Sequence, residues 1–348
     1  MKTLNQIALG FGIALVLATA APVAAGSSGY TVTNFKSFAY PGADHTAVTG
    51  MSGNSAVGYY FSGYGNSHGF SYDGSIFKNL DYPHSDETEI DGANGNIVVG
   101  TWYAAGGGPN RGFVYDGSQF RSLDGPGAYN TIVDGMFGSN VVGRYGNNTD
   151  LTTYYFIYNG STFNTLSSIP VDNFPELHSV PTNAVIINGH IYDGAVFYRL
   201  DYPGSATSGI LGVSGGLVVG VYFNDPDFAP HYFIYDGSTF SKLALPDTAQ
   251  VKGLSGRTVF GLYFGSDPTY RGFTAQLSEA LLRVSVTPSN AMVISWPFPS
   301  TGWDLQQKSN FTGTNWVTPP ETIANDGTNN FIIVNTSSGN RFFRLQQN

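Results

Sequence analysis

The chain has no cysteine among its 348 residues. Without thiols it can form no disulfide bond, no cysteine nucleophile and no cysteine-ligated metal site. If such a protein is exported, its stability has to come from burial of a hydrophobic core rather than from covalent crosslinks.

Charged residues are also scarce, at 11% of the chain, with 24 acidic against 15 basic ones. The formal net charge is −9, and no cluster of Lys or Arg stands out. A diffuse acidic charge without a basic patch argues against nucleic acids and anionic lipid surfaces as partners. It favours solubility, and we expect a monomer.

Long apolar runs are missing except at the N-terminus. There Lys2 precedes an apolar stretch, Ile7 to Ala18, which leads to the small residues Val23-Ala24-Ala25. This order is typical of a secretory signal peptide. The sequence therefore predicts a signal peptide over residues 1–25 and a secreted mature chain, extracellular or at the periplasmic or outer surface. A buried helix or a membrane anchor is the alternative, and no later stretch is apolar enough to span a membrane.

The abundant residues are glycine (45), phenylalanine (25) and tyrosine (22). This composition is typical of many short strands with tight turns and aromatic packing between them. No segment after the signal has the pattern of an amphipathic helix.

An internal repeat organises most of the chain. The phrase "YDGSIFKNL" recurs in related forms that begin at Tyr72, Tyr115, Tyr158, Tyr192 and Tyr235. The periods are 43, 43, 34 and 43 residues. A second phrase, such as "VVGTW" at Val98, keeps step with the first. Units of about 40 to 50 residues with four short β segments predict a β-propeller.

Each unit is interpreted as four strands joined by two tight turns and one long loop. In the second unit the turns are Gly95-Asn96 and Asp116-Gly117, and the latter suits a type I′ hairpin. In the short unit a two-residue turn, Asn188-Gly189, replaces the long loop. We expect the nine missing residues to come from that loop and to leave the strands in place.

The ends of the array predict how the ring closes. The last unit stops after "RGFTAQL" from Arg271, whereas the chain starts with an isolated fourth-strand phrase, "TVTNFKSFAYPG" from Thr31. The expected fold is all-β, with a six-bladed propeller over residues 26–279 that the N-terminal strand closes. An open β-solenoid is the structural alternative.

Residues 280–348 no longer follow the repeat. Six short strand patterns separated by Pro, Gly, Ser and Asn predict a small β-sandwich. Trp296, Trp303 and Trp316 could form a sugar-binding surface, but in so small a domain the core is the favoured place for them.

The repeat units resemble a known family. "HGFSYDGSIFKNLDYP" from His68 and "GNIVVGTWY" from Gly95 are similar to the HAF-type extracellular repeats of secreted bacterial proteins, over about Thr31 to Leu277. The tail resembles short C-terminal sandwich modules that end in "RFFRL". The resemblance implies an exported repeat propeller and no defined activity. The histidine of the motif is replaced at Arg111, Arg271 and Tyr154, so it is no fixed functional residue.

Strand alternation places all the long loops on one face of the propeller, and loops on a rigid scaffold commonly carry function. Aromatic rings with polar partners there would suit a glycan, because rings stack on sugar faces and polar groups bind hydroxyls. Ordinary exposed loop residues are the alternative. The candidate ligand-binding residues are Tyr64, His68, Tyr82, Trp102, Arg111, Tyr202, His231, Tyr270 and Arg271.

Acidic residues offer weaker candidates. Asp86, Glu87 and Glu89 supply carboxylates for acid/base hydrolysis, and Asp225 and Asp227 could ligate Ca²⁺. A solvated acidic loop is the favoured interpretation of both groups, because neither lies in a recognised motif. We expect no catalytic residue and no cofactor, with calcium unproven.

Two further aspartates precede glycines of first strands. Asp91 and Asp134 either point into the channel or cap turns. The six histidines lack metal-ligand spacing.

Three functions remain open from the sequence. The preferred one is a non-catalytic binding or adhesion protein that holds a glycan or a cell-surface protein on the long-loop face. A propeller hydrolase or lyase acting on polysaccharide would need acidic or histidine side chains converging near the axial channel. A structural envelope or matrix protein would have no concave polar pocket.

Overall fold

The structure is a computed structural model that describes the chain in segments. These are residues 7–9, 29–104, 106–148, 152–167, 169, 174–224, 229–265, 269–289, 291–298, 300, 303–309, 315–334 and 341–347. Within these segments every regular element is a β-strand. None of the described residues belongs to a helix long and apolar enough to cross a membrane. The all-β class predicted from the sequence is confirmed.

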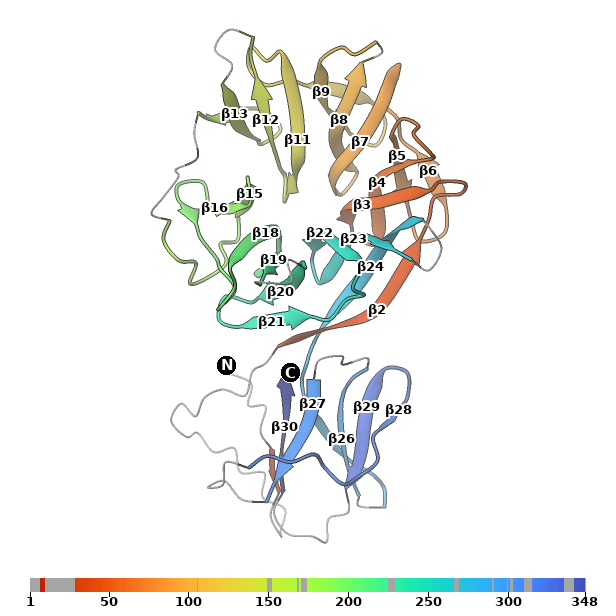
Figure 1. The fold of residues 1–348 in the computed structure, drawn as a ribbon, viewed down its shortest axis with the longest axis vertical. Helices are drawn as coiled ribbons and strands as arrows, with labels where there is room; N and C mark the ends of the chain where they lie inside the picture. Colours follow the sequence, from red (N-terminus) through yellow and green to blue (C-terminus); the bar gives the residue numbers. More distant parts are fainter. Residues whose placement is uncertain are drawn as a thin grey trace. The chain divides into compact units, whose positions relative to one another are not determined.

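The chain divides into two compact units. One contains residues 34–238 and 245–276, and the other contains 1–33, 239–244 and 277–348. The first of these units holds most of the repeat residues, whose sheets are arranged around a common centre as the blades of a propeller (Figure 1).

The first three blades have four antiparallel strands each. Blade one consists of β3 (His45–Ser52), β4 (Ser55–Phe61), β5 (His68–Tyr72) and β6 (Phe77–Asn79). Blade two consists of β7 (Ser85–Asn94), β8 (Ile97–Ala104), β9 (Asn110–Tyr115) and β10 (Phe120–Leu123). Blade three consists of β11 (Asn130–Phe137), β12 (Asn140–Gly146), β13 (Thr153–Tyr158) and β14 (Phe163–Leu166).

The remaining blades vary this plan. Blade four consists of β15 (Val185–Ile187), β16 (His190–Tyr192) and β17 (Phe197–Tyr198). Blade five consists of β18 (Thr207–Ser214), β19 (Leu217–Phe223), β20 (His231–Tyr235) and β21 (Phe240–Leu243). Blade six consists of β22 (Ala249–Ser255), β23 (Thr258–Phe264), β24 (Tyr270–Glu279) and, from the other end of the chain, β2 (Tyr30–Phe38).

The ring closes between the two ends of the repeat array. The N-terminal strand β2 pairs with β24 and so completes blade six, as the sequence predicted. A parallel pairing of Tyr270 with His45 also links blade six to blade one. Because both ends of the array are paired, closure leaves no open sheet edge where blade six meets blade one.

In five of the six blades one phenylalanine forms the centre of the packing. It lies on the third strand, and in blades one, two, three and five it comes two residues before the tyrosine of the repeated phrase. The side chains of Phe70, Phe113, Phe156, Phe233 and Phe273 are each 0% exposed. A large ring buried at the same place in five blades fixes the spacing between neighbouring sheets.

The tight turns differ in type from the sequence prediction. At Gly95-Asn96 only Gly95 has a positive φ, of 59°, which fits a type II′ hairpin. The turn after β9 spans four residues, and the Asp116 carboxylate accepts hydrogen bonds from the backbone N–H groups of Ser118 (2.9 Å) and Gln119 (2.8 Å). The type I′ prediction for Asp116-Gly117 is wrong, because an Asx-turn satisfies these donors and leaves only Gly117 at positive φ.

Blade four also departs from the prediction. Its sheet has three strands among the described residues, so the shortening did not leave all the strands in place. β15 lies innermost and contacts β18 of the next blade. The preceding residues pass along the outer side, where Leu177 N donates to Arg199 O (3.1 Å) and Arg199 N donates to Pro175 O (3.0 Å). Asn188 (φ 49°) and Gly189 (φ 78°) join β15 to β16 directly.

The C-terminal residues form the small β-sandwich expected from the sequence. One sheet contains β25 (Arg283–Val286), β26 (Met292–Pro297), β29 (Asn329–Val334) and β28 (Ala324–Asn325). The other contains β1 (Ile7–Leu9), β30 (Arg341–Gln347) and β27 (Trp303–Lys308). Trp296 and Trp303 belong to its core, at 2% and 5% exposure. The ring centroid of Trp316 lies 4.6 Å from the Lys308 ammonium and 4.4 Å from the Arg344 guanidinium.

Strand β1 lies inside the predicted signal peptide. It pairs with β30, with Ile7 opposite Phe343. β27 pairs with the same strand through six residue pairs, from Trp303↔Gln347 to Lys308↔Phe342. Removal of residues 1–25 would therefore leave β30 with a partner strand.

Candidate functional site

The first strands of five blades share a β-bulge at the same register. The pairing with the second strand shifts between Val48 and Gly50, Ile90 and Gly92, Val133 and Gly135, Ile210 and Gly212, and Val251 and Gly253. In each case one extra residue is left between the paired positions. These bulge residues are Thr49, Asp91, Asp134, Leu211 and Lys252. A bulge changes the direction of the side chain that it carries, and bulges are frequent beside functional sites.

The glycine after the bulge allows neighbouring first strands to approach one another at Gly50, Gly92 and Gly212. A Cβ atom on Gly92 would lie 2.8 Å from the backbone nitrogen of Met136, and one on Gly212 would lie 2.7 Å from that of Leu254. No larger residue fits at these distances. These glycines therefore let the bulge residues come together at the inner edge of the ring.

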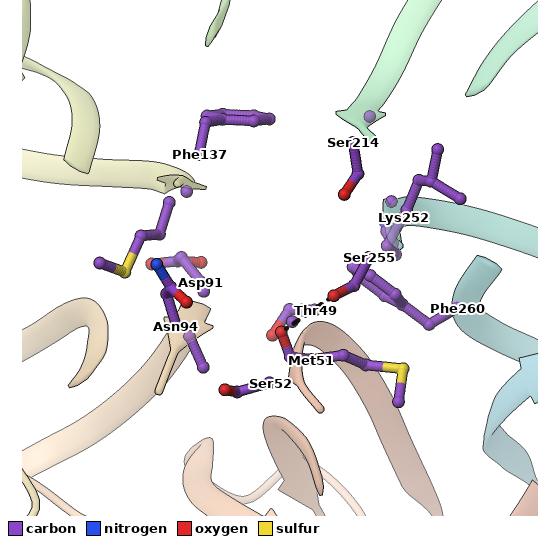
Figure 2. Close-up of a pocket in the computed structure, with 18 of the residues that line it drawn as sticks. Thr49, Met51, Ser52, Asp91, Asn94, Phe137, Ser214, Lys252, Ser255 and Phe260 are labelled. Atoms are coloured by element: carbon purple, nitrogen blue, oxygen red, sulfur yellow. Dashed lines mark hydrogen bonds between the residues drawn. The ribbon is translucent and has the colours of Figure 1, made fainter. Parts of the chain in front are cut away.

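All five bulge residues line one cavity of about 240 Å³, which is called the axial cavity below. Figure 2 shows Thr49, Asp91 and Lys252 around it. The cavity lies toward the turns between first and second strands, because its lining runs from the bulges to those turns. The long loops leave the opposite end of the first strands. The other lining side chains labelled in Figure 2 are Met51, Ser52, Asn94, Phe137, Ser214, Ser255 and Phe260.

Asp91 is the most perturbed acid of the cavity. Desolvation raises its pKa well above the ordinary value, and the negative charges of Glu89 and Asp134 raise it further. The Thr101 hydroxyl donates a hydrogen bond to its Oδ2 atom (3.3 Å), which opposes this rise. A carboxyl group in such surroundings retains its proton at a higher pH than a free one and can donate it.

Asp134 has a different environment in the same cavity. Its carboxylate accepts a hydrogen bond from Arg144 and forms an ion pair with it. Burial raises the pKa of Asp134 above its ordinary value, although the charge of Arg144 and its hydrogen bond oppose this rise. Two carboxyl groups in one cavity, only one of which has a guanidinium partner, are suited to different protonation states.

The carboxylates predicted on the loop form a row on β7. Glu87 and Glu89 alternate along the strand and therefore share one face. The charge of Glu89 reaches the bulge residue Asp91. The Ser67 hydroxyl donates to Glu87 (3.2 Å) and to Glu89 (3.4 Å). Burial and the Glu87 charge raise the pKa of Glu89. Burial and these carboxylates raise the pKa of Tyr103 to about 12.

Asp86 points elsewhere, because its carboxylate accepts a hydrogen bond from Gly106 N (3.2 Å) in the exposed loop. The acidic group predicted from the sequence is therefore divided. Glu87 and Glu89 extend along β7 toward Asp91, whereas Asp86 supports the loop that contains Gly106.

Tyr82, Trp102 and Tyr202, which were predicted to bind a ligand, lie in ring stacks that join one blade to the next. Each tyrosine that follows a fourth strand stacks on a ring of the next second strand. The centroid distances are 3.5 Å for Tyr40 and Tyr60, 4.5 Å for Tyr82 and Trp102, and 4.0 Å for Tyr202 and Tyr222. The histidines extend two of these stacks, His68 against Tyr60 (5.4 Å) and His231 against Tyr222 (5.2 Å). These contacts give the residues a structural role, and ligand binding by them stays a prediction.

The other predicted residues do not converge. His68 pairs with Asp81 (2.9 Å) and Arg111 pairs with Asp124 (3.1 Å), each beside its own blade. Tyr270 contacts His45 (5.0 Å), and Arg271 lies opposite Tyr263 on the neighbouring strand. Tyr64 is fully exposed.

The metal prediction is not addressed by the described residues. Asp225 and Asp227 lie outside them. Elsewhere, no three His, Asp or Glu side chains with described positions are placed to hold a metal ion.

Replacement of Trp102 by alanine tests the structural role of the stacks. We expect the free energy of unfolding to fall by about 2 to 3 kcal/mol, because a half-buried indole and its stack on Tyr82 are lost. Chemical denaturation measures this change, and Tyr64→Ala is the matched control because Tyr64 is fully exposed. A Trp102→Ala variant with unchanged stability and lost ligand binding would show that the ring serves binding instead.

The cavity residues were only partly visible in the sequence. Asp91 and Asp134 stood out as acids before glycines, and the structure places both at the cavity. Thr49, Leu211 and Lys252 share their register but not their chemistry, so no residue type marks them. The position before the first-strand glycine in each repeat is the signal that would have found all five.

No protein-family model matches the chain, and no curated protein matches its sequence. Among solved structures, the β-propeller domain of the Trilobed protease from Pyrococcus furiosus has 8% identity, covering 77% of this chain and 91% of that one, with a TM-score of 0.40. The Aleuria aurantia lectin in complex with Fucα1-6GlcNAc has 11% identity, 89% and 96% coverage and a TM-score of 0.35. A family 117 glycoside hydrolase from Zobellia galactanivorans has 9% identity, 72% and 90% coverage and a TM-score of 0.32.

Proposed function

We propose that this is a secreted, non-catalytic protein that binds a neutral glycan and holds one sugar residue in the axial cavity. The observation that carries the proposal is the convergence of the five bulge residues on one cavity. A concave site with a few converging polar groups and a perturbed carboxyl group is the usual form of a small-ligand site.

The lining of the cavity suits a sugar. Asp91 and Asn94 offer acceptors and donors for hydroxyl groups, and serine hydroxyls surround them. The ring of Phe137 offers apolar surface for a sugar face.

The charges favour a neutral ligand. Asp91 and Asp134 are matched by Lys252 in the lining and by Arg144, which is bound to Asp134. The volume of about 240 Å³ lies just below the range of about 300–1,000 Å³ that is usual for ligand sites, so we assign a single sugar residue to it.

A specific observation favours glycoside hydrolysis as the second candidate function. The desolvated Asp91 can retain a proton, whereas Asp134 is held by Arg144. An acid and a base with separate environments are the pair that glycoside hydrolysis requires.

The proposal is tested on an array of neutral glycans with the secreted chain, while the release of reducing sugars is followed in the same wells. We expect selective binding without release, and a loss of about tenfold or more in affinity for Phe137→Ala. Phe264→Ala is the matched control, because this half-exposed ring lies outside the cavity.

Three other outcomes are informative. Release of reducing sugars would replace the binding function with hydrolysis. Binding that survives Phe137→Ala but is lost in Tyr64→Ala would move the site to the long-loop face. No binding to any neutral glycan would contradict the proposal.

A further inference from the structure

Blade four breaks the packing rule of the propeller at one position. The buried phenylalanine two residues before the repeated tyrosine is His190 in this blade, two residues before Tyr192. The five phenylalanines are fully buried, whereas His190 is only half-buried. A smaller and polar ring therefore replaces the residue that fills the space between blades elsewhere.

A second cavity lies beside His190. It has a volume of about 490 Å³ and lies between blades four and five. Its walls include Phe174, His190, Tyr198, Arg199, Asp201 and Gly209. The volume falls within the range of about 300–1,000 Å³ that is usual for small-ligand sites.

Two features shape this cavity. The two-residue turn Asn188-Gly189 replaces the long loop of the other blades at one edge. On the facing strand β18, Gly209 occupies the position that holds Ala47, Glu89, Ile132 or Gln250 in other blades. A Cβ atom on Gly209 would meet only Val221 Cγ1, at 3.6 Å. The missing side chain thus enlarges the cavity rather than permitting a close backbone approach.

The polar groups of the cavity are fixed in place. His190 Nδ1 lies 3.0 Å from the Asn188 carbonyl oxygen. A carbonyl oxygen can only accept, so the hydrogen-bond network assigns a proton to Nδ1, and in the neutral imidazole Nε2 is then the acceptor. The ring of Phe174 lies 4.6 Å from the imidazole. Arg199 and Asp201 form an ion pair at the wall, so these two charges balance.

We propose that this blade-four cavity is a second saccharide site, larger than the axial one and specific for a neutral oligosaccharide. The inference rests on the proposed glycan-binding function and adds a separate site to it. The Phe174 and His190 rings present faces for a sugar ring. The Nε2 acceptor and the balanced Arg199–Asp201 pair suit hydroxyl groups rather than a charged ligand.

The test uses calorimetric titration of the full secreted chain with neutral di- to hexasaccharides of glucose, galactose, mannose, xylose or fucose. We expect two binding sites per chain. His190→Phe restores the residue of the other blades, and Gly209→Ile introduces the residue of blade three. Each variant should lower the affinity of the blade-four site by about tenfold or more and leave binding at the axial site unchanged.

Phe137→Ala is the complementary variant, which should remove the axial site alone. Thermal melting checks that each variant folds, and His190→Phe should fold because five blades carry phenylalanine there.

The outcomes separate the two proposals. A single site that is lost in Phe137→Ala and retained in His190→Phe and Gly209→Ile would overturn the blade-four site and leave the proposed function standing. A single site that is retained in Phe137→Ala and lost in His190→Phe and Gly209→Ile would support the blade-four site and contradict the axial one. Absence of saccharide binding in the wild-type chain would overturn both.

Discussion

Replacement of Asp91 by asparagine is expected to raise the stability of the protein. The wild-type carboxyl group is desolvated and lies near the charges of Glu89 and Asp134. Asparagine has a similar shape and can still accept the Thr101 hydrogen bond, but it carries no charge. We expect a gain of at least about 1 kcal/mol near neutral pH, or about 2 to 4 °C in Tm.

The pH dependence of this gain in stability follows from the direction in which the pKa of Asp91 is shifted. The pKa of Asp91 is raised in the folded chain above its ordinary value of 3.8, so the folded chain holds this proton more tightly than the unfolded chain. Stability from this group is therefore complete below pH 3.8 and is lost as the pH rises through the raised pKa. The advantage of Asp91→Asn should be largest above that pKa and should vanish in acid.

Asp134→Asn is the matched control in the same cavity. Burial leaves the pKa of Asp134 above its ordinary value, but the variant also leaves Arg144 without its carboxylate partner, so we expect a change within about 1 kcal/mol rather than the gain of Asp91→Asn. Thermal melts of both variants between pH 3 and pH 8 measure the difference. A loss of stability in Asp91→Asn at neutral pH would show that the charge of Asp91 is stabilised by its surroundings.

Replacement of Gly100 by alanine is expected to destabilise the propeller by about 3 kcal/mol or more. The new Cβ atom would lie 2.1 Å from the carbonyl oxygen of Glu89 and 2.8 Å from the ring of Phe113. A backbone carbonyl within a sheet cannot move away as a flexible side chain can. The same clash recurs at Gly58, whose Cβ would lie 1.9 Å from Ala47 O, and at Gly261, at 2.0 Å from Gln250 O.

Gly209→Ala is the matched control for this prediction, because its nearest contact of 3.6 Å is an ordinary one. Its stability should stay within about 0.5 kcal/mol of the wild type. Urea denaturation of the two variants gives the comparison. Equal stability of Gly100→Ala and the wild type would mean that the first and second strands can separate without loss of packing.

The candidate site could be predicted only in part, because a sequence reports the residue types of a position and not the direction of their side chains. Asp91 and Asp134 attracted notice as acids, whereas Lys252 and Leu211 gave no chemical signal. The rings of Trp102 and Tyr82 have the composition of a binding surface, yet they stack on each other. Aromatic loop residues look alike in a sequence whether they face a ligand or a neighbouring blade.

The sequence by itself determined the all-β class, the repeat and the closure of the ring by the N-terminal strand. These features follow from local patterns: turn residues at fixed offsets, alternating apolar positions and a fourth-strand phrase at the wrong end of the chain. Only the tertiary structure decided which residues meet at the axis and what fills blade four. Convergence at the axis depends on a bulge and on the approach of first strands that are about forty residues apart in the chain. The blade-four cavity depends on the path that the chain takes when one loop is lost, and no local pattern encodes that path.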